Sequence, residues 1–343
     1  MVGQLFFPLR PFFKRCHGQL RRSSTCFFFP GQGAQYVGMC KSFLKEPTVI
    51  QLFDDAHKIL GYDLLNICLN GPAEVLNKTE TCQPAVVVSS LAALRFHRAK
   101  QSKVFPDWSN KLDACTTITA GFSVGELTAL IFSGALSFKD GLRLVQLRAQ
   151  AMQEASDRHP SCMVSIMASK DQSVEELCDS AKEWSRHRGV QEPVACTANY
   201  LFPGGWVVGG DNLSLQYILE FGKSKHGIKR AQIIPVSGAF HTKLMESAQD
   251  PLRRALESID VQSPKCTVYS GTSCEPFTTP DHIKSLLLRQ LVEPVNWMKT
   301  IQNITKECGN DITVFEIGPG KQLRSMISRI DRALLTNFTN LET

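Results

Sequence analysis

The residues best suited to chemistry in this 343-residue chain form the segment Gly121-Phe122-Ser123-Val124-Gly125. A β-branched run over Thr116–Thr119 precedes it, and an apolar pattern with helical spacing follows it. Gly-x-Ser-x-Gly between a strand and a helix is typical of a nucleophile elbow, a turn so tight that its glycines cannot carry side chains. Such a turn would expose the Ser123 hydroxyl and direct the Val124 N–H toward an oxyanion. The same pattern also occurs in turns where the serine only caps a helix.

A basic side chain, Arg148, stands on the apolar stripe of a second predicted helix. That helix begins at a capping box, Ser137 to Asp140, and is expected to run to about Ser156. Leu144 and Met152 lie one turn to either side of Arg148, so the guanidinium is expected to be buried. A buried guanidinium keeps its charge and needs a carboxylate or several carbonyl groups. The pattern leaves two partners open, namely a structural ion pair or the carboxylate of a substrate.

One histidine has the position expected of a general base. Of the eight histidines, only His241 stands at a predicted strand-to-helix boundary beside a glycine-bearing turn, Ser237–Phe240. Side chains at such an edge reach ligands bound over a parallel sheet, so His241 could take the proton of Ser123. A structural histidine is the plainer alternative.

The elements that would position these residues alternate between strand and helix. A buried strand over Cys26–Phe29 leads into a glycine-rich turn, Pro30–Gln35, which lacks the Walker lysine. Helices are predicted over 48–69, with a break near Gly61, and from Pro84 in a first turn to about Phe96. The strand Thr313–Ile317 runs into Gly-Pro-Gly and a C-terminal helix. This alternation predicts an α/β fold with a mostly parallel sheet.

The segment between about 160 and 235 follows a different order. Its strands and helices read β-α-β-β-α-β, with helices near 173–187 and 212–224, as in a ferredoxin-like unit. Since strand and helix alternation resumes afterwards, the unit looks inserted. We therefore expect a core of residues 27–158 and 236–343 and a subdomain of residues 159–235.

Residues 1–26 contain five basic residues, two serines and no acidic residue, which is typical of a mitochondrial transit peptide. A disordered basic tail is the alternative. Without these five charges the net charge falls from +6 to +1, so no nucleic-acid partner is expected. No run of 18 apolar residues is present, so no membrane span is expected either. The twelve cysteines include no CxxC or Cys/His cluster, which predicts reduced core thiols and no metal site.

Together these motifs resemble those of one family, the malonyl-CoA:acyl-carrier-protein transacylases of the mitochondrial type. The matching residues span about 27–330 and are Phe29–Gln35, Gln83–Ala85, Gly121–Glu126, Arg148, Asn199, Gly238–His241, Arg289–Leu291 with Pro294, Val295 and Trp297, and Glu316–Gly320. The resemblance implies a hydrolase-like α/β core with an inserted ferredoxin-like subdomain.

The resemblance also implies the chemistry. Ser123 would attack the malonyl thioester, with His241 as general base, and Arg148 would clamp the malonyl carboxylate. The oxyanion would lie on the backbone N–H groups of Val124 and Gln32.

Three further residues receive roles from the same resemblance. The main-chain carbonyl of Gln290 would orient the histidine, Asn199 would line the pocket, and Phe240 would exclude a methyl-branched acyl group.

The substrates implied are malonyl-CoA and holo acyl carrier protein, with no cofactor, and we expect a monomer in the mitochondrial matrix. One alternative is a serine thioesterase or other hydrolase of the same fold, which would release free acid where a transferase gives acyl-pantetheine. A catalytically silent module that binds carrier protein is the other alternative.

Overall fold

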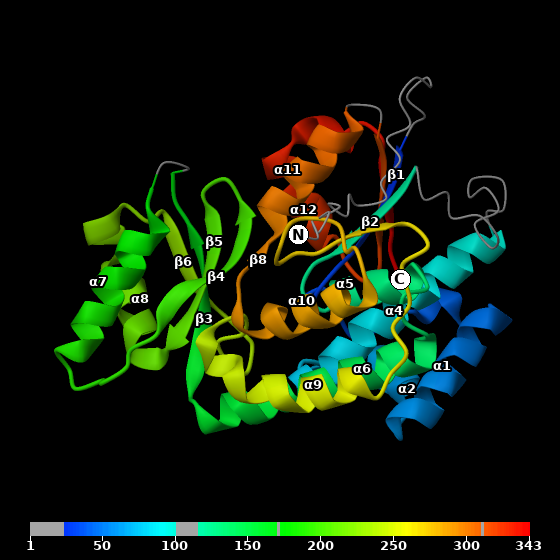
Figure 1. Cartoon of the computed structure of the whole chain (residues 1–343), viewed down its shortest axis with the longest axis horizontal. Coiled ribbons are helices and arrows are strands. Elements are labelled where there is room, and N and C mark those ends of the chain that lie inside the picture. The colour runs from blue at the N-terminus through cyan, green and yellow to red at the C-terminus, as the bar shows by residue number, and fades with distance from the viewer. Residues whose placement is uncertain (1–23, 101–115, 170–171, 310–311) are drawn as a thin grey trace, which may run out of the picture.

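The computed structural model describes residues 24–100, 116–169, 172–309 and 312–343, which form two sheets side by side (Figure 1). The larger sheet has the order β10-β9-β1-β2-β7, and every neighbouring pair in it is parallel. Its strands are β1 Ser24–Phe29, β2 Thr117–Gly121, β7 Thr267–Tyr269, β9 Ile312–Ile317 and β10 Phe338–Leu341. The predicted parallel α/β core is confirmed, although β10, a short strand at the sheet edge, was not predicted.

The central strand β1 is apolar and buried from Cys26 to Phe29 because both faces of this part are covered. Phe27 stacks on Phe315 of β9 with ring centroids 5.5 Å apart, while Phe28 meets Trp297 edge-on on the other face. β1 begins at Ser24 and therefore occupies the last three residues of the segment 1–26 expected as a leader. Residues 1–23, which make up most of that segment, lie outside the described residues.

The helices around the larger sheet include those predicted, with shifted limits, and two longer ones that were not predicted, α10 and α11. They are α1 Pro47–Leu60, α2 Leu64–Asn70, α3 Ala73–Leu76, α4 Thr79–Lys100, α5 Gly125–Phe132, α6 Phe138–Arg158, α9 Gln249–Glu257, α10 Pro280–Val292, α11 Trp297–Cys308 and α12 Gln322–Ile330, with 3-10 turns η1 Lys41–Phe43, η2 Lys243–Ala248 and η3 Arg332–Leu335. Gly61 ends α1 at φ 81°, as expected of the predicted break. Placing Pro84 in a first turn was wrong, because α4 already begins at Thr79.

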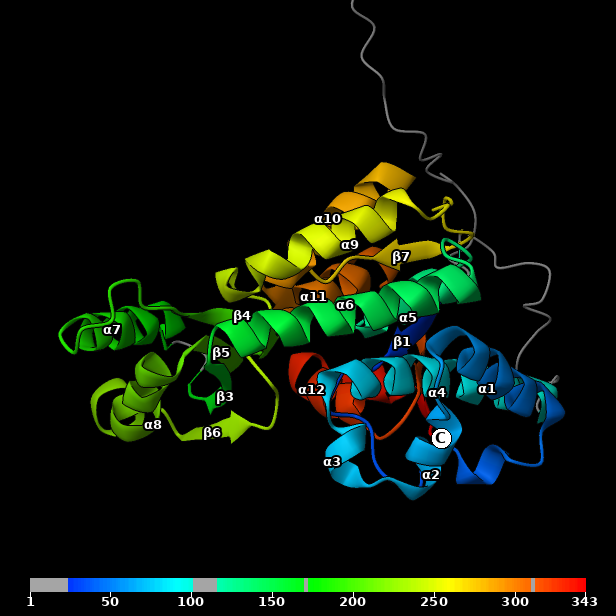
Figure 2. The ribbon, with the colours of Figure 1, turned by 90° about the horizontal axis from the view of Figure 1, so that it is seen from below.

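The capping box at Ser137 is confirmed. Its hydroxyl accepts a hydrogen bond from Asp140 N at 3.0 Å and donates to the Asp140 carboxylate at 2.7 Å. The helix that it starts, α6, leads from the larger sheet to the second sheet, where β3 follows it after two residues (Figure 2). Arg148 lies near the middle of this connecting helix.

The second sheet has the order β6-β3-β5-β4-β8. Its elements are β3 Ser161–Met167, α7 Val174–Arg186, β4 Ala195–Phe202, β5 Gly205–Asp211, α8 Asn212–His226, β6 Arg230–Ile234 and β8 Val295–Asn296. The first four strands pair antiparallel in the ferredoxin-like order, as predicted. β8, from the chain that returns to the core, pairs parallel with β4 and ties the two units together. The exact limits of the two units stay a prediction.

The ten cysteines for which the structure gives a position are free thiols, and seven of them are buried. Within the described ranges, no helix combines the length and the apolar composition needed to cross a bilayer.

Candidate active site

Ser123 occupies the tight turn between β2 and α5 that the glycine pattern predicted. Its φ is 53°, in the left-handed region that residues with a side chain seldom adopt. A Cβ on Gly121 would lie 1.9 Å from the Gly125 carbonyl carbon, and one on Gly125 would lie 2.2 Å from the Phe29 oxygen. Only glycine fits at either position. The backbone around Ser123 is therefore held in place by close packing against its neighbours.

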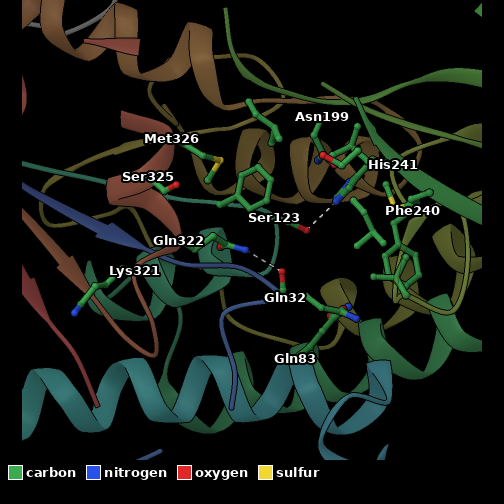
Figure 3. Close-up of a pocket in the computed structure, with 18 residues that line it drawn as sticks. Gln32, Gln83, Ser123, Asn199, Phe240, His241, Lys321, Gln322, Ser325 and Met326 are labelled. Carbon is green, nitrogen blue, oxygen red and sulfur yellow. Dashed lines mark hydrogen bonds between the residues drawn. The ribbon is translucent and has the colours of Figure 1, made fainter. Parts of the chain in front are cut away.

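His241 meets this serine from the segment that follows β6, where the chain returns to the core. Its Nε2 lies 2.8 Å from Ser123 Oγ, and Figure 3 shows the two side chains pointing toward one another. The histidine lies between β6 and η2, with φ 60°, and the Thr242 hydroxyl donates to the Ala239 carbonyl at 2.6 Å to hold the turn. The pair is therefore assembled where the two sheets meet.

The second ring nitrogen of His241 defines its protonation. Nδ1 lies 2.6 Å from the main-chain oxygen of Gln290, and because a carbonyl can only accept, Nδ1 carries the proton. Nε2 is then free to accept from Ser123. Burial, together with the nearby charge of Arg148, lowers the pKa of His241 from 6.5 to about 3. The imidazole is thus neutral near pH 7, the state that a general base requires.

Arg148 is 1% exposed, and amide oxygens hold its guanidinium. Nη1 donates to Gln83 Oε1 at 2.7 Å and Nη2 donates to Gln290 Oε1 at 2.8 Å, while Nη2 also lies 3.4 Å from Ser123 Oγ. Burial lowers the pKa of Arg148 to about 10, which leaves it charged near neutral pH.

Among the described residues, no carboxylate lies within salt-bridge distance of Arg148. The buried Glu126 interacts with it only electrostatically, which raises the pKa of Arg148 and partly offsets the effect of burial. Its buried Nε also lacks a hydrogen-bond partner in the same ranges. The guanidinium therefore keeps donor capacity beside the serine, where the carboxylate of a bound acyl group could use it.

Gln290 does more than the sequence indicated. Besides its carbonyl on His241, its side chain accepts from Arg148 and donates to the Ser123 carbonyl at 3.3 Å. One residue thus fixes the base, the guanidinium and the backbone of the elbow. Gln83 was quoted only as part of a motif, and its function as the second support of Arg148 was missed. A glutamine on the buried face of a predicted helix was the available signal.

The loop Pro30–Gly33 packs directly against the elbow. A Cβ on Gly31 would lie 2.4 Å from the carbonyl oxygen of Phe122, the residue before the serine. Gln32 follows and lines the same cavity as Ser123. Val124 immediately precedes the first residue of α5, so its N–H lies at the positive end of that helix. Both expected oxyanion donors therefore belong to backbone adjacent to Ser123.

A cavity of about 390 Å³ opens over the serine, between the second sheet and the loops and helices at the edge of the larger sheet (Figure 3). Polar and apolar side chains both line it, and most of its surface is apolar. The second sheet contributes Asn199 and Leu201 of β4, Met163 of β3 and Val207 of β5. Phe240 lines it next to His241 and is 5% exposed. Of the eight predicted site residues, five line this cavity. The other three contact Ser123 without lining it: Val124 is the next residue in the chain, Arg148 lies near its hydroxyl, and Gln290 binds its carbonyl.

One buried acid near the site was not predicted. Glu126 of α5 is completely buried, and its Oε2 accepts from Gly271 N at 2.6 Å. Burial raises the pKa of Glu126 to about 7, against the opposing effect of that hydrogen bond. In the part of the chain that the structure describes, no group of three His, Cys, Asp or Glu residues could hold a metal ion.

Comparisons with known proteins agree on the kind of domain. Residues 26–332 match the family model described as an acyl transferase domain. Malonyl-CoA-acyl carrier protein transacylase, mitochondrial, of Mus musculus is 41% identical over 326 residues, covering 94% of this chain and 83% of the relative. The acyl-carrier-protein S-malonyltransferase of Burkholderia pseudomallei 1710b is 34% identical, with a TM-score of 0.81 over 93% of this chain and 96% of its own.

A further solved structure contains a partner. It is a type II polyketide synthase acyl-carrier protein in complex with its malonyl-transacylase, which has a TM-score of 0.79 and 31% identity over 94% of this chain and 97% of that chain.

Proposed function

This chain belongs to the malonyl-CoA-acyl carrier protein transacylase family, and we propose that it transfers malonyl from malonyl-CoA to acyl carrier protein through an ester on Ser123. The observation that carries the proposal is the meeting of three groups. The serine oxygen lies 2.8 Å from a neutral histidine and 3.4 Å from a buried, charged guanidinium. A base and a carboxylate-binding group thus both lie within contact distance of the nucleophile.

In the first half-reaction, the Ser123 oxygen attacks the thioester carbonyl while its proton passes to His241 Nε2. The oxyanion is stabilised by the N–H groups of Val124 and Gln32. When the tetrahedral intermediate collapses, the C–S bond breaks, and His241 returns its proton to the departing CoA thiolate. Ser123 is left as a malonyl ester whose distal carboxylate lies against Arg148 in a charge-assisted pair.

In the second half-reaction, the same groups act in reverse order. His241 takes the proton of the phosphopantetheine thiol of the carrier protein, the thiolate attacks the ester, and Ser123 recovers its proton. These steps need only the side chains described, so no cofactor is part of the proposal. The apolar lining of the cavity supports transfer over hydrolysis, because it disfavours water near the ester.

A serine hydrolase of the same fold remains the alternative to test. In a Ser-His-Asp hydrolase an acid orients the histidine, whereas here a main-chain carbonyl does so. The test mixes the protein with malonyl-CoA and holo acyl carrier protein and measures both products. Malonyl-carrier protein in large excess over free malonate supports the transferase. Release of malonate at the same rate with and without carrier protein would establish the hydrolase.

Acyl carrier protein is the partner that the family supports, and the complex of a similar transacylase with its carrier supports it further. The name of the mouse relative and the basic, acid-free leader support a mitochondrial location. We further propose that the protein is located in the mitochondrial matrix and that it acts as a monomer. Protease protection in intact and swollen mitochondria tests the first extension, and sedimentation equilibrium tests the second.

A further inference from the structure

Gln322, the first residue of α12, holds the loop that carries one of the two oxyanion donors. Its Oε1 accepts from Gly31 N at 2.9 Å. Its Nε2 donates to the Gln32 carbonyl at 3.1 Å, the bond drawn between the two residues in Figure 3. The contacts join residues about 290 positions apart in the chain. A single amide thus binds the peptide groups on either side of the Gly31–Gln32 peptide bond.

The peptide bond between them is fixed from inside the loop. Ala34 N donates to the Gly31 carbonyl at 3.3 Å, and Gly33 adopts φ 100°, as in a type II turn. The Gly31–Gln32 bond is trans, so its N–H points opposite to its carbonyl. The direction of the Gln32 N–H therefore follows from the placement of its two neighbouring peptides, which Gln322 holds from outside the turn and the Ala34 hydrogen bond holds from inside.

The amide of Gln322 is itself held firmly. Glu316, which is completely buried, accepts from Leu323 N at 2.7 Å and from Arg324 N at 2.9 Å and so anchors the first turn of α12. Gly318, at φ 144°, comes so close to the loop that a Cβ there would lie 2.8 Å from a carbon of Pro30. The start of α12 and the loop therefore form one packed unit.

We propose that Gln322 is a positioning residue that aims the Gln32 N–H at the oxyanion of the acyl-transfer step. The inference rests on the proposed function, because it assumes that an oxyanion forms at Ser123. Gln322 does not need to touch the acyl group, since it acts through the peptide of Gln32. Loss of one correctly placed oxyanion donor slows such reactions by about a hundredfold to a thousandfold, and a misaimed donor retains part of that effect.

The test uses two substitutions in the full-length protein. Gln322→Met keeps the volume and removes both hydrogen bonds. Gln322→Glu keeps the shape and the acceptor for Gly31 but opposes the Gln32 carbonyl and the oxyanion with a negative charge. The matched control, Ser328→Ala, removes the 2.8 Å bond from Ser328 to the Ser325 carbonyl within the same helix, away from the loop. The readouts are the single-turnover rate of malonyl-ester formation at Ser123, the concentration dependence of that rate, and the Tm.

Gln322→Met should slow ester formation at saturating malonyl-CoA by about tenfold to a hundredfold, with the half-saturating concentration changed by less than about twofold. Gln322→Glu should be at least as slow, and Ser328→Ala should stay within about twofold of wild type. The pH dependence of the rate should not change, because His241 is untouched.

A wild-type rate in Gln322→Glu would contradict the proposal, since a merely structural role tolerates the isosteric variant. A lower Tm with an unchanged rate in both variants would contradict it as well. Absence of the ester in the wild-type protein would overturn the proposed function itself, and is distinguishable because it needs no variant.

Discussion

The Nδ1 atom of His241 lies 2.6 Å from the main-chain oxygen of Gln290, so a neutral group orients the catalytic base. A carboxylate in that place would stabilise the imidazolium that forms during transfer, and a carbonyl does so less. Arg148 opposes the imidazolium further by its positive charge. The proton that His241 takes from Ser123 is therefore held weakly and is readily returned to a leaving thiolate.

Burial and the charge of Arg148 predict an unusual pH profile, against the smaller opposing effect of the Gln290 hydrogen bond. Since burial and Arg148 lower the pKa of His241 to about 3, the base stays neutral as the pH falls through 6.5, the ordinary value for histidine. The kcat/KM for malonyl-CoA should therefore remain level through that pH, where an unperturbed base would begin to lose activity. Stopped-flow measurements after brief pH jumps, with circular dichroism at each pH as the control for folding, check this. An inflection near 6.5 would contradict it.

Arg148 is predicted to determine the preference for malonyl over acetyl. Removal of one member of a buried charge pair costs about 3–5 kcal/mol, so Arg148→Ala should lose at least about a hundredfold in malonyl transfer while acetyl-CoA becomes a comparable or better substrate. Arg148→Lys should restore little, because Gln83 and Gln290 are spaced for the two Nη atoms of a planar guanidinium. Both transfer rates and the Tm are to be measured. A less stable protein that retains its malonyl preference would make Arg148 structural.

A substitution at Gln83 tests the charge of Arg148 without removing Arg148. Gln83→Glu would place a carboxylate against Arg148 Nη1. This carboxylate would neutralise the positive charge of Arg148 and repel the carboxylate of the malonyl group. Malonyl transfer should fall by about tenfold or more, while acetyl transfer falls much less. Gln150→Glu introduces the same charge at an exposed position of α6 and serves as the control. Equal losses for both acyl groups in Gln83→Glu would show that Arg148 does not read the carboxylate.

Phe240 is predicted to exclude a methyl branch. Its ring lines the cavity next to His241 and is buried, so an acyl group with an extra methyl would meet it. Steric selection of one methyl is worth about 1–3 kcal/mol, so Phe240→Ser should relax the preference for malonyl over methylmalonyl by about tenfold to a hundredfold. The ratio of kcat/KM values for the two thioesters measures this. If the ratio in the variant equals that of wild type, another residue is the filter.

The sequence predicted those parts of the site that depend on local pattern. The two glycines around Ser123 and the turn before His241 are signals carried by neighbouring residues, and the structure places both residues at the same cavity. Arg148 was identified because it lies on an apolar stripe, where a buried guanidinium needs an anionic or carbonyl partner. The ferredoxin-like order followed from the succession of elements, whereas β10 and the start of α4 at Thr79 gave no local signal strong enough to set them.

The supporting amides could not be predicted in the same way. The side chains of Gln83, Gln290 and Gln322 act where α4, α10 and α12 converge on the elbow, and no spacing in the sequence records that convergence. A glutamine on a helix is ordinarily a surface residue, so even where periodicity places it on a buried face, as for Gln83, the pattern does not say what its amide binds. Their functions become visible only once the partners of each amide are known.

The central claim is that the malonyl group passes through an ester on Ser123. Brief mixing with malonyl-CoA without carrier protein, followed by acid quenching and peptide mass spectrometry, tests it most directly. We expect one malonyl group per chain, located on Ser123, absent from Ser123→Ala, and lost when holo acyl carrier protein is added, with the malonyl group recovered on its phosphopantetheine thiol. A malonyl group on a cysteine, or labelling that persists undiminished in Ser123→Ala, would contradict the account.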